Sequence, residues 1–405
     1  MKISSQNKMK ALQLIVSLIL IYYHTLLSQG QSPESFEAGE STISVFDKPV
    51  EFTGWKGEVS SLQMLSEIHI GLFIPYDPAD PVAGPILQAA ELAISEFNSN
   101  GGYYGLPFRL KTRWSYNPWG AGSKEMIKLV YEDSVWAVIG SLDGTATHIA
   151  QQIVTKAWVP LLSPVSADPT LTYIRIPWIF RFPPDFKIQT RVIAQQGIET
   201  ASLKKVGLIT STNHDGRTFA KDMITQLGNI QVNPLFHFEI SAANLDINEL
   251  IRRLGSYEIE AMIWYLPPPI IKELIGKLPN NAGKSAIILP WIPGVTAEEL
   301  SKLYDGKIYF LQAFSTVSNP AYTIFADKYF QRFGIYPPAD AAYTYDAVRL
   351  LVHSLFISGL SRSRLREEIA GIGTFEGVTG KICWDNGGGN HTEPVLKILQ
   401  AIESK

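Results

Sequence analysis

Cysteine is nearly absent from this chain of 405 residues, because Cys383 is the single example. One thiol excludes an internal disulfide, so the fold must be stabilised by its hydrophobic cores. A chain of this length is expected to form two domains or lobes, and its hydrophobic residues, 46% of the total, can fill large cores. The composition therefore excludes a small secreted module held together by disulfides.

Basic stretches are also missing. The formal net charge is -3, and residues 1–30 contain three lysines and no acidic residue, so the remaining chain is more acidic than the total. Nucleic-acid-binding proteins present clustered lysine and arginine to the phosphate backbone. We therefore expect no nucleic-acid partner.

Motifs for catalysis and for metal binding are absent as well. The seven histidines are scattered, and none forms an H-x-x-x-H pair. No G-x-S-x-G elbow surrounds Ser141, no G-x-x-x-x-G-K loop occurs, and Cys383 has no histidine in its segment. The sequence predicts a protein that is not an enzyme and that has no cofactor and no metal site.

The N-terminus carries a long apolar stretch. Residues 1–30 combine a lysine-bearing start, apolar residues from Ala11 to Leu27, and the small residues Ser28 and Gly30. This order is typical of a signal peptide that is cleaved after export. A retained membrane anchor is the alternative, because the stretch is nearly long enough to span a bilayer. Either way, we expect the body in the periplasm or on the extracellular face.

Residues 31–67 are polar and rich in serine and glutamate, which predicts a linker or N-terminal arm. From Ile68 onward, strand-like runs alternate with helical patterns. The first series of runs is Ile68–Ile74, Phe108–Trp114, Val135–Ser141, Val159–Pro164 and Trp178–Pro183. The second series is Val206–Ser211, Val232–Ile240, Glu260–Leu266, Ala286–Trp291 and Lys307–Phe314. This alternation predicts an α/β fold with two mostly parallel sheets flanked by helices.

Ligands of parallel sheets bind beyond the carboxyl ends of the strands. One such turn, in "VWAVIGSLDGTATHIAQQIV" (135–154), joins a buried strand to a helix. The free N–H groups at the start of that helix suit an anion or another hydrogen-bond acceptor. Two alternatives stay open: Gly144 serves only a tight turn, and Asp143 caps the helix.

The order of these motifs resembles the leucine/isoleucine/valine-binding type of solute-binding protein, with the type I periplasmic-binding fold. The resemblance covers Ile68 to the C-terminus. It rests on the segments "IHIGLFIPYDPADPVAGPILQAAELAISEFNSNGGYYGLPFRL", "VWAVIGSLDGTATHIA", "VPLLSPVSADPTLT", "KKVGLITSTNHDGRTFA" and "NPAYTIFADKYFQRFGIYPPADAAYTYDAVRLL".

The resemblance implies two lobes joined by three crossings. The first lobe would be residues 68–184 with 317–375, and the second would be 185–315 with 376–405. The crossings would lie near Pro183–Phe186, Phe314–Ser318 and Gly377–Trp384. The implied function is capture of a small solute by hinge closure and its delivery to an ABC-type membrane permease by a monomeric protein. A ligand-sensing receptor component of the same fold is the alternative.

The resemblance also implies a ligand site on the turns that follow the strands. Its expected residues are Tyr76, Asp77, Ser141, Asp143, Gly144, Thr145, Ser163, Ser166, Asp215 and Trp291. Where relatives carry a threonine for the ligand carboxylate, this chain has Ala167. Where amino-acid binders carry an acid for the ligand ammonium, this chain has Trp291.

These departures shift the expected ligand class, because a buried ammonium without an acidic partner costs several kcal/mol. Asp215 or Asp143 could supply the acid from another place, as in a branched-chain amino-acid binder with an altered anchor. Trp291, Trp264 and Tyr265 could instead stack on a ring, a sugar or a quaternary ammonium. We therefore expect a small polar or aromatic-bearing solute.

Overall fold

The computed structural model describes residues 65–278, 285–304, 306–317 and 319–399. The predicted signal peptide and nearly all of the predicted arm lie outside these residues. Within the described residues, no helix is both long and apolar enough to cross a membrane.

A five-stranded sheet forms from the first series of strand-like runs. Its order is β2-β1-β3-β4-β5, and all neighbouring strands are parallel. The strands are β1 (Ile68–Leu72), β2 (Phe108–Thr112), β3 (Val138–Ile139), β4 (Leu161–Ser163) and β5 (Ile179–Arg181). The helices between them are α2 (Ala83–Ser99), η2 (Pro118–Gly122), α3 (Ser123–Tyr131), α4 (Gly144–Ala157) and α5 (Thr170–Tyr173). Buried apolar residues of the strands pack under these helices.

A six-stranded sheet forms from the five runs of the second series and one strand near the C-terminus, after α6 (Phe186–Val192) and η3 (Ile193–Glu199). Its order is β13-β10-β9-β8-β6-β7, and only β13 runs antiparallel to its neighbour. The strands are β6 (Val206–Ser211), β7 (His237–Ile240), β8 (Ala261–Tyr265), β9 (Ala286–Leu289), β10 (Ile308–Gln312) and β13 (Val395–Leu399). The helices are α7 (His214–Asn229), η4 (Ala242–Asn244), α8 (Ile247–Leu254), α9 (Pro268–Lys277) and α10 (Ala297–Ser301).

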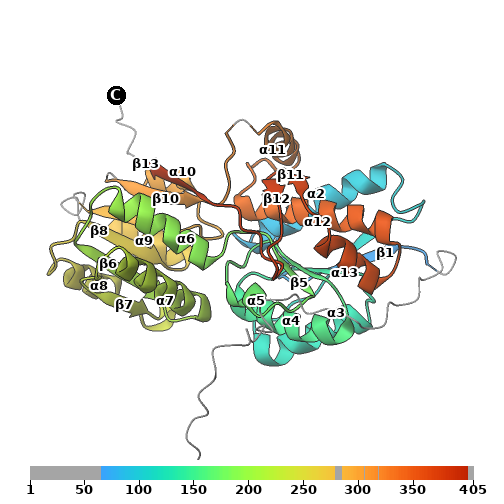
Figure 1. Cartoon of the computed structure of the whole chain (residues 1–405), viewed down its shortest axis with the longest axis horizontal. Helices are drawn as coiled ribbons and strands as arrows, with labels where there is room; N and C mark the ends of the chain where they lie inside the picture. Colours follow the sequence, from blue (N-terminus) through green and yellow to red (C-terminus); the bar gives the residue numbers. More distant parts are fainter. Residues whose placement is uncertain (1–64, 279–284, 305, 318, 400–405) are drawn as a thin grey trace, which may run out of the picture. The chain divides into compact units, whose positions relative to one another are not determined.

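The chain then adds three helices and a hairpin. These are α11 (Pro320–Phe333), α12 (Ala339–Ser358), α13 (Arg362–Ala370), β11 (Phe375–Gly377) and β12 (Gly380–Ile382). Figure 1 shows α12 beside α2, against which it packs, so this late segment covers the five-stranded sheet. Trp384 and Gly389 also contact β5, through Phe180 and Arg181.

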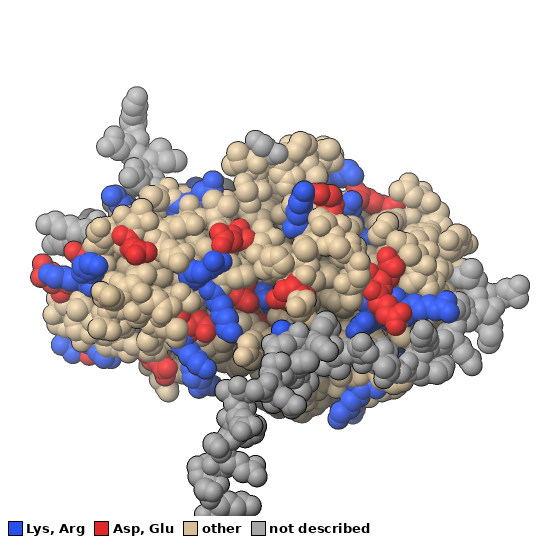
Figure 2. All heavy atoms as spheres, in the orientation of Figure 1, with Lys and Arg blue, Asp and Glu red and all other residues tan. Residues whose placement is uncertain are grey.

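The parallel sheets place the carboxyl ends of their strands, and therefore the following loops, at one edge of each sheet. Figure 2 shows lysine and arginine interspersed with aspartate and glutamate on the face in view. The predicted α/β architecture is confirmed, while the lobe boundaries and the three crossings stay predictions.

Candidate functional site

The turn after β3 starts α4 with a helix cap. The Asp143 carboxylate accepts a hydrogen bond of 2.7 Å from the Ala146 N–H, as an N-cap residue does. Gly144 is the first residue of the helix and is buried. In this structure the Asp143 side chain therefore caps α4, as the capping alternative proposed.

The Gly144 N–H donates to the chain's own Asp215. Both carboxylate oxygens of Asp215 lie 3.1 Å from the Gly144 nitrogen. Asp215 lies in the first turn of α7, beside the six-stranded sheet, so this bond connects elements of the two sheets. An acceptor at the start of α4 is what the sequence predicts, and here a side chain of the protein supplies it.

Burial raises the pKa of Asp215 to about 7, and the neighbouring charge of Asp143 adds to the rise. The Gly144 N–H opposes this change by stabilising the carboxylate. Asp215 is 6% exposed. The protonation state of Asp215 is therefore sensitive to any charged or hydrogen-bonding group that comes close to its carboxylate.

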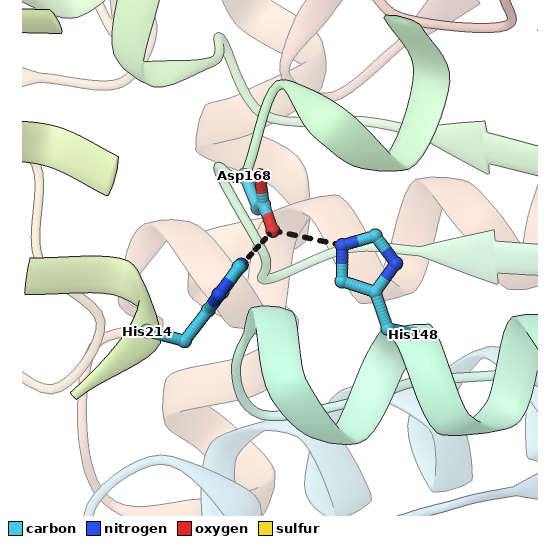
Figure 3. A group of neighbouring side chains, drawn as sticks. All are labelled: His148, Asp168 and His214. Atoms are coloured by element: carbon cyan, nitrogen blue, oxygen red, sulfur yellow. Dashed lines mark hydrogen bonds and ion pairs between the residues drawn. The ribbon is translucent and has the colours of Figure 1, made fainter. Parts of the chain in front are cut away.

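Asp168 joins the same region with two histidines (Figure 3). Its Oδ2 lies 3.0 Å from Nε2 of His148 and 2.6 Å from Nε2 of His214. His148 is on α4, Asp168 is in the loop after β4, and His214 starts α7. Three separate segments thus bring polar side chains to one point.

Hydrogen bonds determine the protonation of this group. Burial alone would raise the pKa of Asp168, but its bonds from His148 and His214 hold that pKa well below the usual value. Burial opposes protonation of His148, yet the hydrogen bond and charge of Asp168 raise its pKa above the usual value. The arrangement favours an ionised Asp168 beside a histidine that is readily protonated.

The predicted serines are buried, and two of them bond within the fold. Ser141 is fully buried, and its hydroxyl donates to the Phe73 carbonyl at 2.9 Å. The Ser166 hydroxyl accepts from the Asp168 N–H at 3.3 Å. The Ser163 hydroxyl is buried without a partner among the described residues. Thr145, in the first turn of α4, is half-buried.

Tyr76 and Asp77 lie in a different place. Both follow β1 in an exposed loop, where Tyr76 is 71% exposed and Asp77 accepts from the Ala79 N–H at 2.9 Å. They line a cavity of about 330 Å³ together with Arg113 and Trp114. The structure therefore does not bring these two residues into the Asp215 region.

Trp291 lines a cavity of its own, of about 230 Å³, together with Phe314, Tyr322 and Asp340. Its ring meets that of Tyr343 edge-on, with centroids 6.0 Å apart. The aromatic walls come from loops after β9 and β10 and from α11, while Asp340 lies in the first turn of α12. This cavity combines apolar surface with the carboxylate of Asp340 and the side chain of Lys397, and apolar walls with a few polar groups are the usual makeup of a small-molecule site.

Asp340 is the acidic residue of this cavity, and the sequence patterns did not single it out. It is 1% exposed, its Oδ1 accepts from the Ala341 N–H at 3.1 Å, and its Oδ2 has no partner among the described residues. Burial raises its pKa to about 7. An acid in the first turn of a helix is common, so the sequence offered no signal for this residue.

The other candidates belong to the interior. Trp264 is fully buried in the core beside the six-stranded sheet. Tyr265 stacks on Phe219, with ring centroids 5.0 Å apart. Arg181 is 1% exposed and forms an ion pair of 3.0 Å with Asp185. This ion pair lies at the predicted crossing near Pro183–Phe186.

Comparison with known proteins places the chain among relatives. The sequence pattern of the periplasmic binding protein family matches residues 67–403. A protein of Pseudomonas aeruginosa called "Amino acid binding protein" is 22% identical over 334 residues, which cover 81% of this chain and 88% of that protein. Glutamate receptor 3.1 of rice is 25% identical over 149 residues, 36% of this chain, and the matched part spans only 16% of the receptor.

A solved structure shows the same fold. It is the branched-chain amino acid transporter substrate-binding protein LivJ of Streptococcus pneumoniae, in complex with isoleucine. Its TM-score is 0.72 at 22% identity, over 80% of this chain and 93% of that protein. The predicted type I periplasmic-binding fold is confirmed by this likeness. Because the family pattern covers most of its length, the chain belongs to the periplasmic binding protein family.

Proposed function

We propose that this chain is an extracytoplasmic solute-binding protein that captures a small molecule by hinge closure and delivers it to an ABC-type permease. Family membership supports this function, as does the likeness to relatives whose names describe amino-acid binding. The lobes are residues 68–184 with 317–375, and 185–315 with 376–405. Nothing in the proposed role requires a chemical reaction, so the protein is a carrier and not an enzyme.

One observation carries the choice of ligand site: the cavity that Trp291 and Asp340 share. An unpartnered carboxylate oxygen in a buried position costs free energy unless a donor or cation meets it. Trp291, Phe314 and Tyr322 line the same cavity as this carboxylate. A ligand with a positive charge and a small apolar part would pair with Asp340 and pack on the rings.

The size of the cavity limits the ligand further. Its volume of about 230 Å³ lies below the ~300–1,000 Å³ of pockets that hold drug-sized ligands. A primary amine or a quaternary ammonium compound of a few carbon atoms fits these limits. Asp340 thus supplies the acid that the position of Trp291 lacks.

A ligand carboxylate has less support. The Gly144 N–H, the expected carboxylate anchor, already bonds Asp215. A carboxylate that replaced Asp215 there would also meet the negative charges of Asp143 and Asp168. We therefore favour an amine without a carboxylate over a branched-chain amino acid.

A thermal-shift panel tests the proposal. It would contain small amines, quaternary ammonium compounds, branched-chain amino acids, aromatic acids and sugars. A ligand at a hundred times its dissociation constant adds about 2.7 kcal/mol of apparent stability, a rise of several degrees in Tm. We expect the rise with an amine, and a smaller rise in Trp291→Leu. A rise with acids or sugars alone would overturn the ligand class, and no rise on folded protein would overturn solute binding.

A further inference from the structure

Two imidazoles and one carboxylate oxygen converge at a single point of the structure. The Nε2 atoms of His148 and His214 and the Oδ2 of Asp168 face one another (Figure 3). One ligand atom from each residue lies within 4.8 Å of the others, and the two rings are nearly perpendicular at 89°. Nitrogen and carboxylate donors at this spacing suit a tetrahedral zinc ion, whose ligand bonds are about 2.0–2.2 Å long.

Neighbouring groups hold two of the three side chains, Asp168 and His148, in this orientation. The N–H and the hydroxyl of Thr170 both donate to Oδ1 of Asp168, at 2.9 and 2.7 Å, which leaves Oδ2 for the histidines. Nδ1 of His148 lies 3.2 Å from the side-chain oxygen of Gln151, which fits an N–H at Nδ1. The Gln151 amide is fixed in turn by its bond to the Leu171 carbonyl. Metal-ligating histidines are oriented in this way by a partner of the second ring nitrogen.

The surroundings carry an excess of negative charge. Asp143 and Asp168 both act electrostatically on Asp215. A methyl group on Gly144 would lie 2.3 Å from Oδ1 of Asp215 and 2.8 Å from Oδ2 of Asp168. These two carboxylates therefore face the same small space, which a cation would stabilise.

The point is also reachable from solvent. The side chain of His214 is 39% exposed and that of His148 is 27% exposed, whereas Asp168 is fully buried. A metal ion needs such an entry path beside a fixed carboxylate. Imidazole with carboxylate favours zinc, copper and nickel over magnesium and calcium, which prefer oxygen alone.

We propose that His148, Asp168 and His214 bind a divalent transition-metal ion such as Zn²⁺. Two ligands belong to the five-stranded sheet's connections and the third to α7 of the six-stranded sheet, so the ion bridges the two α/β halves. It replaces the hydrogen bonds that Asp168 now makes to the two rings. The Asp215 carboxylate, which accepts from the Gly144 N–H, lies nearby.

Calorimetric titration of ZnCl₂ into the full chain, cleared of metal by a chelator, tests this site. We expect one ion per chain, and binding of Mg²⁺ that is far weaker than that of Zn²⁺. Loss of an outer partner of a metal ligand lowers affinity about 10–100-fold. The variants His148→Gln and His214→Gln, which lack a ligand, should therefore lose more than about 100-fold.

Two further variants keep the test decisive. His391→Gln changes an exposed histidine and should bind zinc like the wild type. Gln151→Leu should weaken binding by about 10–100-fold while all three ligands remain. Circular dichroism shows whether each variant is folded. Folded wild type that binds no zinc, or zinc affinity that both ligand variants retain, would overturn the site.

Discussion

Gly144 occupies a position where a side chain has no room. A methyl group there would collide with the Asp215 and Asp168 carboxylates, both of which are buried and hydrogen-bonded. The hydrogen bonds from the Gly144 N–H also require the Asp215 carboxylate to lie close to the Gly144 backbone. Glycine is therefore required here by packing.

We predict that Gly144→Ala destabilises the protein by about 1–3 kcal/mol, the usual cost of overpacking a filled site. Urea unfolding followed by circular dichroism measures the change. Gly228→Ala is the matched control, because Gly228 lies in α7 and a methyl group there would meet only open space. That control should be neutral or slightly stabilising, since alanine favours helices more than glycine does. Equal stability of Gly144→Ala and wild type would contradict the contact.

Asp340 gives the stability a pH dependence. Its pKa is raised to about 7 in the fold from a usual value of 3.8. Between these values the folded protein keeps a proton that the unfolded chain has released, so the free energy of unfolding falls as pH rises. Above pH 7 the whole contribution of the protonated Asp340 to the free energy of unfolding is lost, and this contribution is at most about 4 kcal/mol.

The variant Asp340→Asn lacks this contribution. We therefore predict that Asp340→Asn gains stability relative to wild type as pH rises from 4 to 8. Unfolding in urea at pH 4, 6 and 8 measures this difference. Asp327→Asn, at an exposed position on α11, should follow the wild type at every pH. A constant difference between Asp340→Asn and wild type would show that Asp340 does not titrate in this range.

At the scale of elements, Asp346 ties α12 to the β11–β12 hairpin. Its carboxylate accepts from the Val378 N–H at 2.8 Å and from the N–H and hydroxyl of Thr379 at 2.9 and 2.7 Å. Gly377 lets the turn approach, because a methyl group there would lie 2.3 Å from the carboxylate. Asp346 is fully buried.

We predict that Asp346→Ala costs at least about 2 kcal/mol, because it leaves three buried donors without their charged acceptor. Chemical unfolding at neutral pH measures this cost. Asp327→Ala serves as the surface control, and a change at an exposed position usually stays within about 0.5 kcal/mol. If Asp346→Ala costs no more stability than this control, the hydrogen bonds between Asp346 and the hairpin do not stabilise the fold as proposed.

The elements were largely predictable from the sequence, because hydrophobic runs and turn residues are local signals. The run Phe108–Trp114 predicted a strand, and β2 spans Phe108–Thr112. The run Val232–Ile240 was a poorer guide, since only its last four residues form β7. The antiparallel direction of β13 could not be predicted, because a partner strand far away in the sequence determines it.

The side-chain contacts of the site were less predictable. The sequence drew attention to Asp143, Gly144 and Asp215, yet it did not show that Asp215 would occupy the N–H of Gly144. Sequence motifs for metal binding place histidines at short spacing, whereas His148, Asp168 and His214 are spread over three segments. Their meeting depends on how the two sheets' loops approach each other, which local patterns do not specify.

At the scale of the whole molecule, two α/β halves place different chemistry at two points. One point holds Asp168 with two histidines, and the other holds Asp340 with aromatic rings. We assign the metal ion to the first and the solute to the second. The two assignments are independent, because they predict the loss of zinc binding and of amine binding in different variants.

The binding of an amine at Asp340 is the central claim, and calorimetric titration of that amine tests it most directly. The ligand is the amine that gives the largest thermal shift, titrated into wild type, Asp340→Asn and Asp327→Asn. A hydrogen-bonded charge pair contributes about 1.5–3 kcal/mol, so Asp340→Asn should bind about 10–150-fold more weakly than the other two. Equal affinity of all three proteins would contradict the assignment of the solute to this cavity.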